Sequence, residues 1–256
     1  MATLTKPSSK PKDAPVSQLL GYIPGRLGFK SRRIFYRGLL KQMGKGVCIQ
    51  PHVTLMYPHN IELGNWAMLK SYTILDAGDE CVITIEDKVT LGHGTYIMGG
   101  RVSSKITLKE DVSLDNGVQI KSMKHGHIEI GNGTYVGAYT CISGPGPVKI
   151  GKHCLVAAHC GIYGNHHNFD DPTRLIKEQI LSSQGITIED DCWLGTGVKV
   201  LDGVTIGKGS IIGASAVVNK NIPPYSIAVG IPAKVISSRF KTEEKTSESA
   251  NQNFTN

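Results

Sequence analysis

The chain has 256 residues, of which 40% are apolar and 19% are charged, and these values fit one large folded domain or two small ones. It contains 30 Gly but only 5 Phe and 2 Trp, a composition that argues against an ordinary helical bundle and favours many turns. The net charge of +7 is uneven: residues 1–46 carry ten basic side chains and one acid, so the rest of the chain nets −2 and is not expected to bind nucleic acid.

The beginning of the chain has no feature of a membrane span or an export signal. Residues 1–18 are polar, contain no apolar run typical of a secretory signal, and are predicted to be disordered. No apolar run approaches the 18 residues that a transmembrane helix needs. Six cysteines without an export signal indicate reduced thiols, so we expect a cytoplasmic protein.

The basic segment 19–46 contains a predicted amphipathic helix over residues 26–43. Five cations are spaced to share one face, and five apolar side chains lie opposite: Arg26, Lys30, Arg33, Arg37 and Lys41 against Phe35, Tyr36, Leu39, Leu40 and Met43. We expect this helix to cap a folded body with its apolar side inward. Peripheral docking of the same helix on the anionic inner face of a membrane is a compatible alternative.

A six-residue repeat dominates residues 47–236. Aliphatic residues recur every sixth position, with a small or β-branched residue four positions later; the longest unbroken run is Ile188, Leu194, Val200, Ile206, Ile212 and Val218. This period fits neither an α-helix nor a simple alternating strand. It predicts short strands joined by corners, three to a coil of 18 residues, with the aliphatic side chains stacked inside. Cys154, Cys160 and Cys192 occupy the small inward position and are expected to be buried packing thiols.

The distances between coils locate one large insertion. Coils that start at residues 63, 85, 108, 130, 150, 188 and 206 are 22, 23, 22, 20, 38 and 18 residues apart. Every insertion follows the third strand of its coil, so all should leave from one edge of a three-sided prism. The large one, residues 163–187, follows Ile162 and is expected to be functional or disordered.

This pattern, together with the closing segment from Asn221 to Ile236, resembles the hexapeptide-repeat acyltransferases. The resemblance implies an all-β fold, a left-handed parallel β-helix, with one long loop insertion and an N-terminal amphipathic helix. It also implies a homotrimer in which the active groove lies between neighbouring subunits. The segment from residue 237 to 256 is expected to be a largely disordered tail.

The insertion carries the candidate catalytic residue. Its sequence from His167 to Asp170 resembles the His-x-x-Asp segment of the galactoside, maltose and xenobiotic O-acetyltransferases, and its continuation to Arg174 resembles acetyltransferases of surface-polysaccharide assembly. This resemblance implies that His167 is the general base, with His166 as the alternate. A neutral imidazole can accept the proton of an alcohol that attacks a thioester, so no covalent intermediate is needed.

The last coils carry the candidate donor site. Positions that match the family's acetyl-CoA contacts are Trp193, Thr196, Ala214, Asn219, Lys220 and Lys234. Trp193 could equally be a packing residue on a coil or subunit surface. Gly137 and Pro145 stand where the galactoside and maltose enzymes bind sugar through Asn and Asp, so those two acceptors are not expected.

The function predicted from the sequence is acetyl-CoA-dependent O-acetylation of a sugar, in a surface polysaccharide or its precursor, without a metal. N-acetylation of an amino sugar is a close alternative. A zinc-dependent β-helix of the γ-carbonic-anhydrase type is less favoured, because His153 and His159 occupy equivalent positions on different faces and would not converge. A purely structural solenoid is disfavoured by the long insertion.

Overall fold

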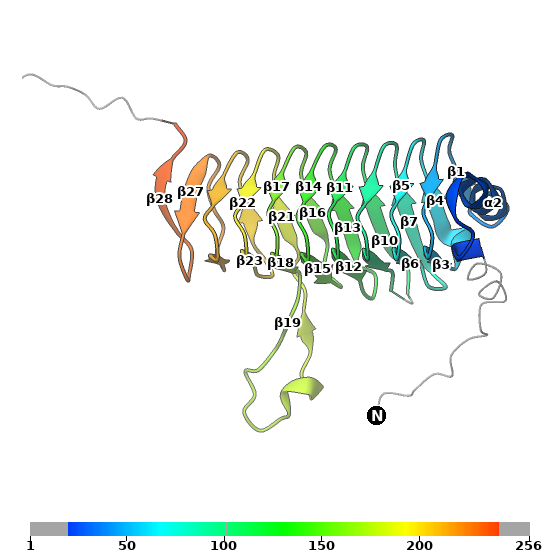
Figure 1. The fold of residues 1–256 in the computed structure, drawn as a ribbon. Helices are drawn as coiled ribbons and strands as arrows, with labels where there is room; N and C mark the ends of the chain where they lie inside the picture. The colour runs from blue at the N-terminus through cyan, green and yellow to red at the C-terminus, as the bar shows by residue number, and fades with distance from the viewer. Residues whose placement is uncertain (1–19, 101, 241–256) are drawn as a thin grey trace, which may run out of the picture.

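The structure, a computed structural model, describes residues 20–100 and 102–240. Most of these residues form a three-sided prism of stacked coils (Figure 1). The left-handed parallel β-helix expected from the sequence is confirmed. The lead at residues 1–18 and the chain beyond residue 240 lie outside the described residues. No helix in the described part of the chain is both long and apolar enough to cross a bilayer.

Each coil contributes one short strand to each side of the prism, and neighbouring coils pair in parallel. The first side contains β1 (Gln42–Met43), β4 (Ile61–Leu63), β7 (Cys81–Ile85), β10 (Ser104–Leu108), β13 (His127–Ile130), β16 (Val148–Ile150), β21 (Ile186–Ile188) and β24 (Thr205–Ile206). The second side contains β2 (Cys48–Ile49), β5 (Met68–Leu69), β8 (Thr90–Leu91), β11 (Ser113–Leu114), β14 (Tyr135–Val136), β17 (Leu155–Val156), β22 (Trp193–Leu194), β25 (Ile211–Ile212) and β27 (Ser226–Val229), which pairs antiparallel with β28 (Lys234–Ser238). The third side contains β3 (Thr54–Met56), β6 (Ile74–Asp76), β9 (Tyr96–Met98), β12 (Gln119–Ser122), β15 (Cys141–Gly144), β18 (Gly161–Tyr163), β23 (Lys199–Val200) and β26 (Val217–Val218).

Three corners connect these sides. The first corner joins the first side to the second, the second corner joins the second side to the third, and the third corner leads to the next coil. The insertions all leave at the third corner, as the spacing predicted. Two short 3-10 helices, η1 (Pro58–Asn60) and η2 (Ile176–Glu178), lie in insertions at this corner.

The hexad positions form the core because they point inward in register. Leu63, Ile85, Leu108 and Ile130 stack on one another along the first side and are each at most 1% exposed. The small inward positions are occupied as predicted: Cys154, Cys160 and Cys192 are buried, and burial raises the pKa of the Cys160 thiol. Every coil therefore buries its apolar residues against the coils on either side.

Glycines at the corners accommodate large side chains of the following coil. Gly117 has a φ of 68°, and a Cβ atom there would lie 2.6 Å from the ring of Tyr139. Gly46 is overlain by Trp66 in the same way. At these two positions glycine supplies both the left-handed backbone and the space for the ring.

The prism begins at Gln42, before residue 47, where the six-residue repeat was predicted to start. Gln42–Met43 form β1, which pairs with β4, whereas the predicted helix ran to residue 43. The observed helix, α2 (Gly25–Arg37), ends where the Gly38 N–H donates to the carbonyls of Phe35 and Tyr36. The reason lies in the hexads: Met43, Ile49 and Leu55 are spaced six apart, and pairing with the next coil outweighs helical continuation.

Helix α2 caps the open end of the prism, and the predicted apolar face is turned inward: Tyr36 and Leu40 belong to the buried core, and Phe35, Leu39 and Met43 pack against it. The helix adds Gly28 and Arg32 to this inward face. Arg32 is 1% exposed, and its guanidinium donates to the carbonyls of Ile49, Leu20 and Ile23 at 2.9–3.0 Å. These bonds fasten the cap to the first coil, since a buried guanidinium needs acceptors in place of water.

Candidate active site

The long insertion is an antiparallel hairpin that projects from the third corner. It leaves after β18, forms β19 (His166–His167) and β20 (Leu181–Ser182), and returns to β21. Figure 1 shows this hairpin extending away from the side of the prism. We call residues 163–187 the flap. The flap thus lies at the predicted corner, and the part of it next to the prism is an ordered β-hairpin.

A buried carboxylate holds the base of the flap. Asp202 lies in the third corner of the following coil, and its side chain is 1% exposed. It accepts hydrogen bonds from the backbone N–H groups of Gln184 and Gly185, at 2.9 and 2.8 Å. Its Oδ2 atom also lies 3.5 Å from Nδ1 of His166. Asp202 thus connects both strands of the flap to the rigid prism.

Asp202 is not among the site residues predicted from the sequence. Its only signal is an acid in a corner, at Leu201-Asp202-Gly203, at the end of the coil that follows the insertion. Because an aspartate at a corner is ordinarily a solvated residue, that signal cannot be separated from the background without the three-dimensional structure.

His167 has the opposite environment from His166. Successive side chains of a strand point to opposite faces, so the contact of His166 with Asp202 turns the His167 ring away from that anchor. His167 is exposed, and within the described residues its side chain makes no hydrogen bond. The structure therefore leaves both nitrogens of this imidazole available to a ligand.

The acids of the flap do not orient either imidazole. Asp171 accepts hydrogen bonds from the backbone N–H and the hydroxyl of Thr173, at 2.9 and 2.6 Å, which lower the pKa of its carboxyl. Gln179 closes the same turn through its side-chain contacts with the backbone of Asp171. Asp171 therefore stabilises the tip of the flap.

The tip also exposes several large apolar side chains. Phe169, Leu175, Ile176 and Ile180 are between 58% and 78% exposed. An isolated chain gains nothing from presenting four such residues to water. This end of the flap therefore has the composition of a surface that another molecule covers.

The predicted donor residues fall in three places on the chain. Trp193 projects from the second side and is 50% exposed, between Leu155 and Ile211 on the adjacent coils. Thr196 and Ala214 are exposed at the second corner on successive coils, where the Ser215 N–H donates to the Thr196 carbonyl at 2.8 Å.

The remaining three donor residues divide between the second and third corners. Asn219 and Lys220 are exposed at the third corner, the one from which the flap leaves. Lys234 begins β28 opposite Val229, at the second-corner end of the last coil. One chain thus presents Thr196, Ala214 and Lys234 along one edge and His167, Asn219 and Lys220 along another, with a whole side of the prism between them.

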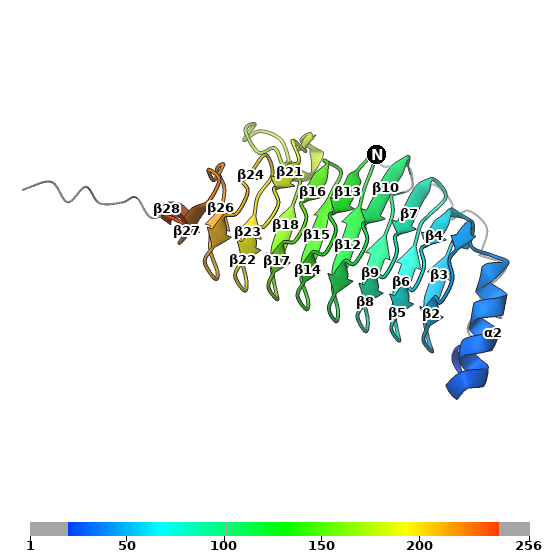
Figure 2. The ribbon, with the colours of Figure 1, turned by 90° about the horizontal axis from the view of Figure 1, so that it is seen from above.

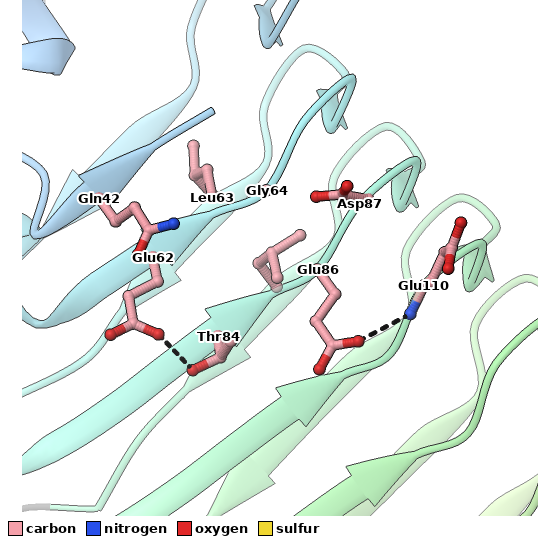
Figure 3. Close-up of a pocket in the computed structure, with 9 residues that line it drawn as sticks. Gln42, Glu62, Leu63, Gly64, Thr84, Glu86, Asp87 and Glu110 are labelled. Carbon is pink, nitrogen blue, oxygen red and sulfur yellow. Dashed lines mark hydrogen bonds between the residues drawn. The ribbon is translucent and has the colours of Figure 1, made fainter. Parts of the chain in front are cut away.

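A pocket on the first side lies apart from all these residues. Figure 3 shows the carboxylates of Glu62, Glu86 and Glu110 along its lining. Each is already paired between coils: Glu62 with Lys41 at 2.8 Å, Glu86 with Lys109 at 2.9 Å, and Glu110 with Lys88 at 2.7 Å. The Thr84 hydroxyl also donates to Glu62. These contacts belong to the stacking of the first coils, and we assign the pocket no ligand.

Across the described residues, no three His, Cys, Asp or Glu side chains lie close enough to hold a metal ion together. His159 stacks on Tyr139 at the second corner, and His153 lies at the first corner beside Gly133. The two histidines are therefore on different edges, as the hexad count indicated.

Comparison with known proteins agrees with this architecture. The family described as bacterial transferase hexapeptide (six repeats) matches residues 185–220. The Escherichia coli K12 protein WbbJ, provisionally named a lipopolysaccharide biosynthesis O-acetyl transferase, is 30% identical over 157 residues, which are 59% of this chain and 80% of WbbJ. The chain belongs to the hexapeptide-repeat acyltransferase family. This establishes the resemblance found in the sequence.

Two further similar proteins differ more from this chain in length or in sequence. Rv3034c of Mycobacterium tuberculosis, provisionally named an acetyltransferase, is 35% identical over 59% of this chain and 50% of its own. The chain spans 42% to 61% of the length of the first three curated relatives it matches. The crystal structure of the polySia-specific acetyltransferase NeuO shares the fold, with a TM-score of 0.56, 22% identity, and coverage of 80% of this chain and 90% of NeuO.

Proposed function

We propose that this protein transfers the acetyl group of acetyl-CoA to a hydroxyl group of a sugar, with His167 as the general base. The observation that carries the proposal is the free imidazole of His167 on a flap whose base is fixed by Asp202. The names of WbbJ and NeuO, an O-acetyl transferase of lipopolysaccharide biosynthesis and a polySia-specific acetyltransferase, support a glycan as the acceptor.

The chemistry requires one base and two substrates held together. His167 would accept the hydroxyl proton while the oxygen attacks the thioester carbon, and the CoA thiolate would leave and take up a proton. General-base assistance of this kind contributes roughly 10²–10⁴-fold, and orientation of the two substrates contributes the rest. An amine acceptor uses the same geometry, so N-acetylation of an amino sugar is the alternative within this proposal.

The placement of the donor residues supports a homotrimer. Thr196, Ala214 and Lys234 lie on a different edge from the flap, Asn219 and Lys220. In a ring of parallel prisms, the second corner of one chain can face the third corner and flap of the next, which would complete three equivalent sites. The exposed apolar tip of the flap would then be covered by the neighbouring chain.

The test of the base compares two neighbouring histidines. We expect His167→Ala to lower the turnover of acetyl-CoA with a sugar panel by about 10²–10⁴-fold, measured by release of free thiol, with the urea midpoint unchanged. His166→Ala is the matched variant, and it should lower turnover much less. If His166→Ala is the more damaging change, then the imidazole paired with Asp202 is the base, because such pairing also activates a histidine. Full activity of both variants would reject the proposal.

Mixing two inactive variants tests the shared site. His167→Ala removes the base, and Ala214→Trp blocks the donor edge with a bulky side chain. If each site combines the edges of two chains, coexpression should recover about a quarter of wild-type activity, since half of the flaps and half of the donor edges are intact. If one chain holds a whole site, the mixture remains inactive.

A further inference from the structure

Helix α2 has an outward face that its role as a cap does not explain. Residues Gly28, Arg32 and Tyr36 are spaced four apart and are buried against the first coil. The opposite face carries Leu27, Lys30, Ile34 and Arg37, with 3-4-3 spacing that aligns them in one stripe along the helix. Leu27 and Ile34 are 72% and 76% exposed.

The surroundings of this stripe are strongly cationic. Arg26 and Arg33 flank it on the same helix, and Lys41 and Lys45 follow in the first coil. Among the carboxylates of the described residues, these four cations have one partner, Glu62, which pairs with Lys41. No Asp or Glu occurs between Asp13 and Glu62, so the helix contains no acid. Tyr22, three positions before the first residue of the helix, is 75% exposed. Apolar and cationic side chains therefore share one surface without competing negative charge.

The position of the helix makes this surface accessible. Figure 2 shows α2 lying across the end of the prism, beyond the first coil and far from the flap. Its outward stripe thus points away from the protein along the axis of the prism. Any ring of parallel prisms would present one such helix per chain at the same end, and several weak contacts would act together.

We propose that the outward face of α2 docks on a bilayer that contains anionic phospholipid. Leu27 and Ile34 would insert among the acyl chains near the headgroups, and Lys30, Arg37 and Arg26 would lie against the phosphates. A second copy of the chain is disfavoured as the occupant, because two such faces would bring like charges together. This inference does not depend on the proposed acetyl transfer.

The experiment is cosedimentation of the full chain with vesicles at about 0.1 M salt. The probes are phosphatidylcholine vesicles with and without a quarter of phosphatidylglycerol. We expect binding only to the anionic vesicles, and its loss at about 1 M salt. The variant Arg26→Gln/Lys30→Gln/Arg37→Gln should bind about a hundredfold more weakly, or roughly fivefold for each cation. Leu27→Ser/Ile34→Ser should also weaken binding, by at least tenfold, because the apolar contact is lost.

Matched control variants distinguish binding through this face from nonspecific binding by other charged or apolar surfaces. Lys149→Gln/Lys152→Gln/Lys208→Gln removes three exposed lysines from the body of the prism. Val235→Ser/Ile236→Ser removes two exposed apolar residues at the opposite end. Both controls should bind anionic vesicles like the unchanged protein. The proposal is overturned if the two control variants bind as weakly as the α2 variants, or if neutral vesicles bind the protein equally well. It is also overturned if the chain does not bind vesicles and instead associates with RNA, or with itself through α2.

Discussion

The prism and the flap obtain their order in different ways. In the prism, each inward residue is enclosed by equivalent residues of the coils on both sides, and Ile120, Ile142 and Ile162 are completely buried. In the flap, the tip side chains are exposed and the base depends on a few polar contacts to Asp202. The difference shows that a rigid repeat can carry a weakly packed element in an ordered position, provided that the junction between them is fixed.

The largest expected effect tests the packing of the prism. Ile142→Ala removes a side chain enclosed by the coils above and below, and we expect it to lower the free energy of unfolding by about 2–5 kcal/mol. The matched change in the flap is Ile176→Ala, where the side chain is 59% exposed, and it should leave the free energy of unfolding nearly unchanged. Urea denaturation followed by circular dichroism measures both. Equal losses would mean that the flap packs as tightly as the prism.

An intermediate effect is expected at the junction. Asp202→Asn retains the size of the side chain but removes a charge that accepts two backbone hydrogen bonds and faces His166. We expect turnover to fall by roughly tenfold to a hundredfold, because a small displacement of a catalytic group is costly, while proteolysis within the flap becomes faster.

The control for the junction is Asp190→Asn. Asp190 accepts the backbone N–H of Lys152 at 2.7 Å, at a corner that bears no flap. This variant should affect stability to a similar extent without lowering the turnover of the folded protein. A turnover loss in Asp190→Asn equal to that in Asp202→Asn would show that any loosened corner has the same consequence.

The smallest expected effect tests the corners. Gly117→Ala introduces a Cβ both at a φ of 68° and against the ring of Tyr139, whereas Gly94→Ala introduces one at a φ of 66° into open space. We expect Gly94→Ala to cost about 1 kcal/mol of unfolding free energy, from the backbone alone. Gly117→Ala should cost more, and adding Tyr139→Ala should remove the difference in a double-mutant cycle. An equal cost for both glycines would show that the ring moves freely.

Much of the architecture could be predicted because the hexad pattern is local. The inward positions, the burial of Cys154, Cys160 and Cys192, and the corner from which the flap leaves all follow from counting residues. The first strand of the first coil, β1, could also have been predicted, since Met43 begins a hexad run. It was missed because the helical spacing of the cations continues to Lys41, which predicts a longer helix, whereas the observed helix ends at Arg37.

The sequence by itself determined the period, the number of residues in each coil and the place of His167, because each depends on spacing along the chain. Only the tertiary structure decided that Arg32 is a buried cap residue, that Asp202 anchors the flap, and that His166 rather than His167 faces this carboxylate. Those roles arise between residues that are 9 to 36 positions apart, and such contacts leave no periodic trace in the sequence.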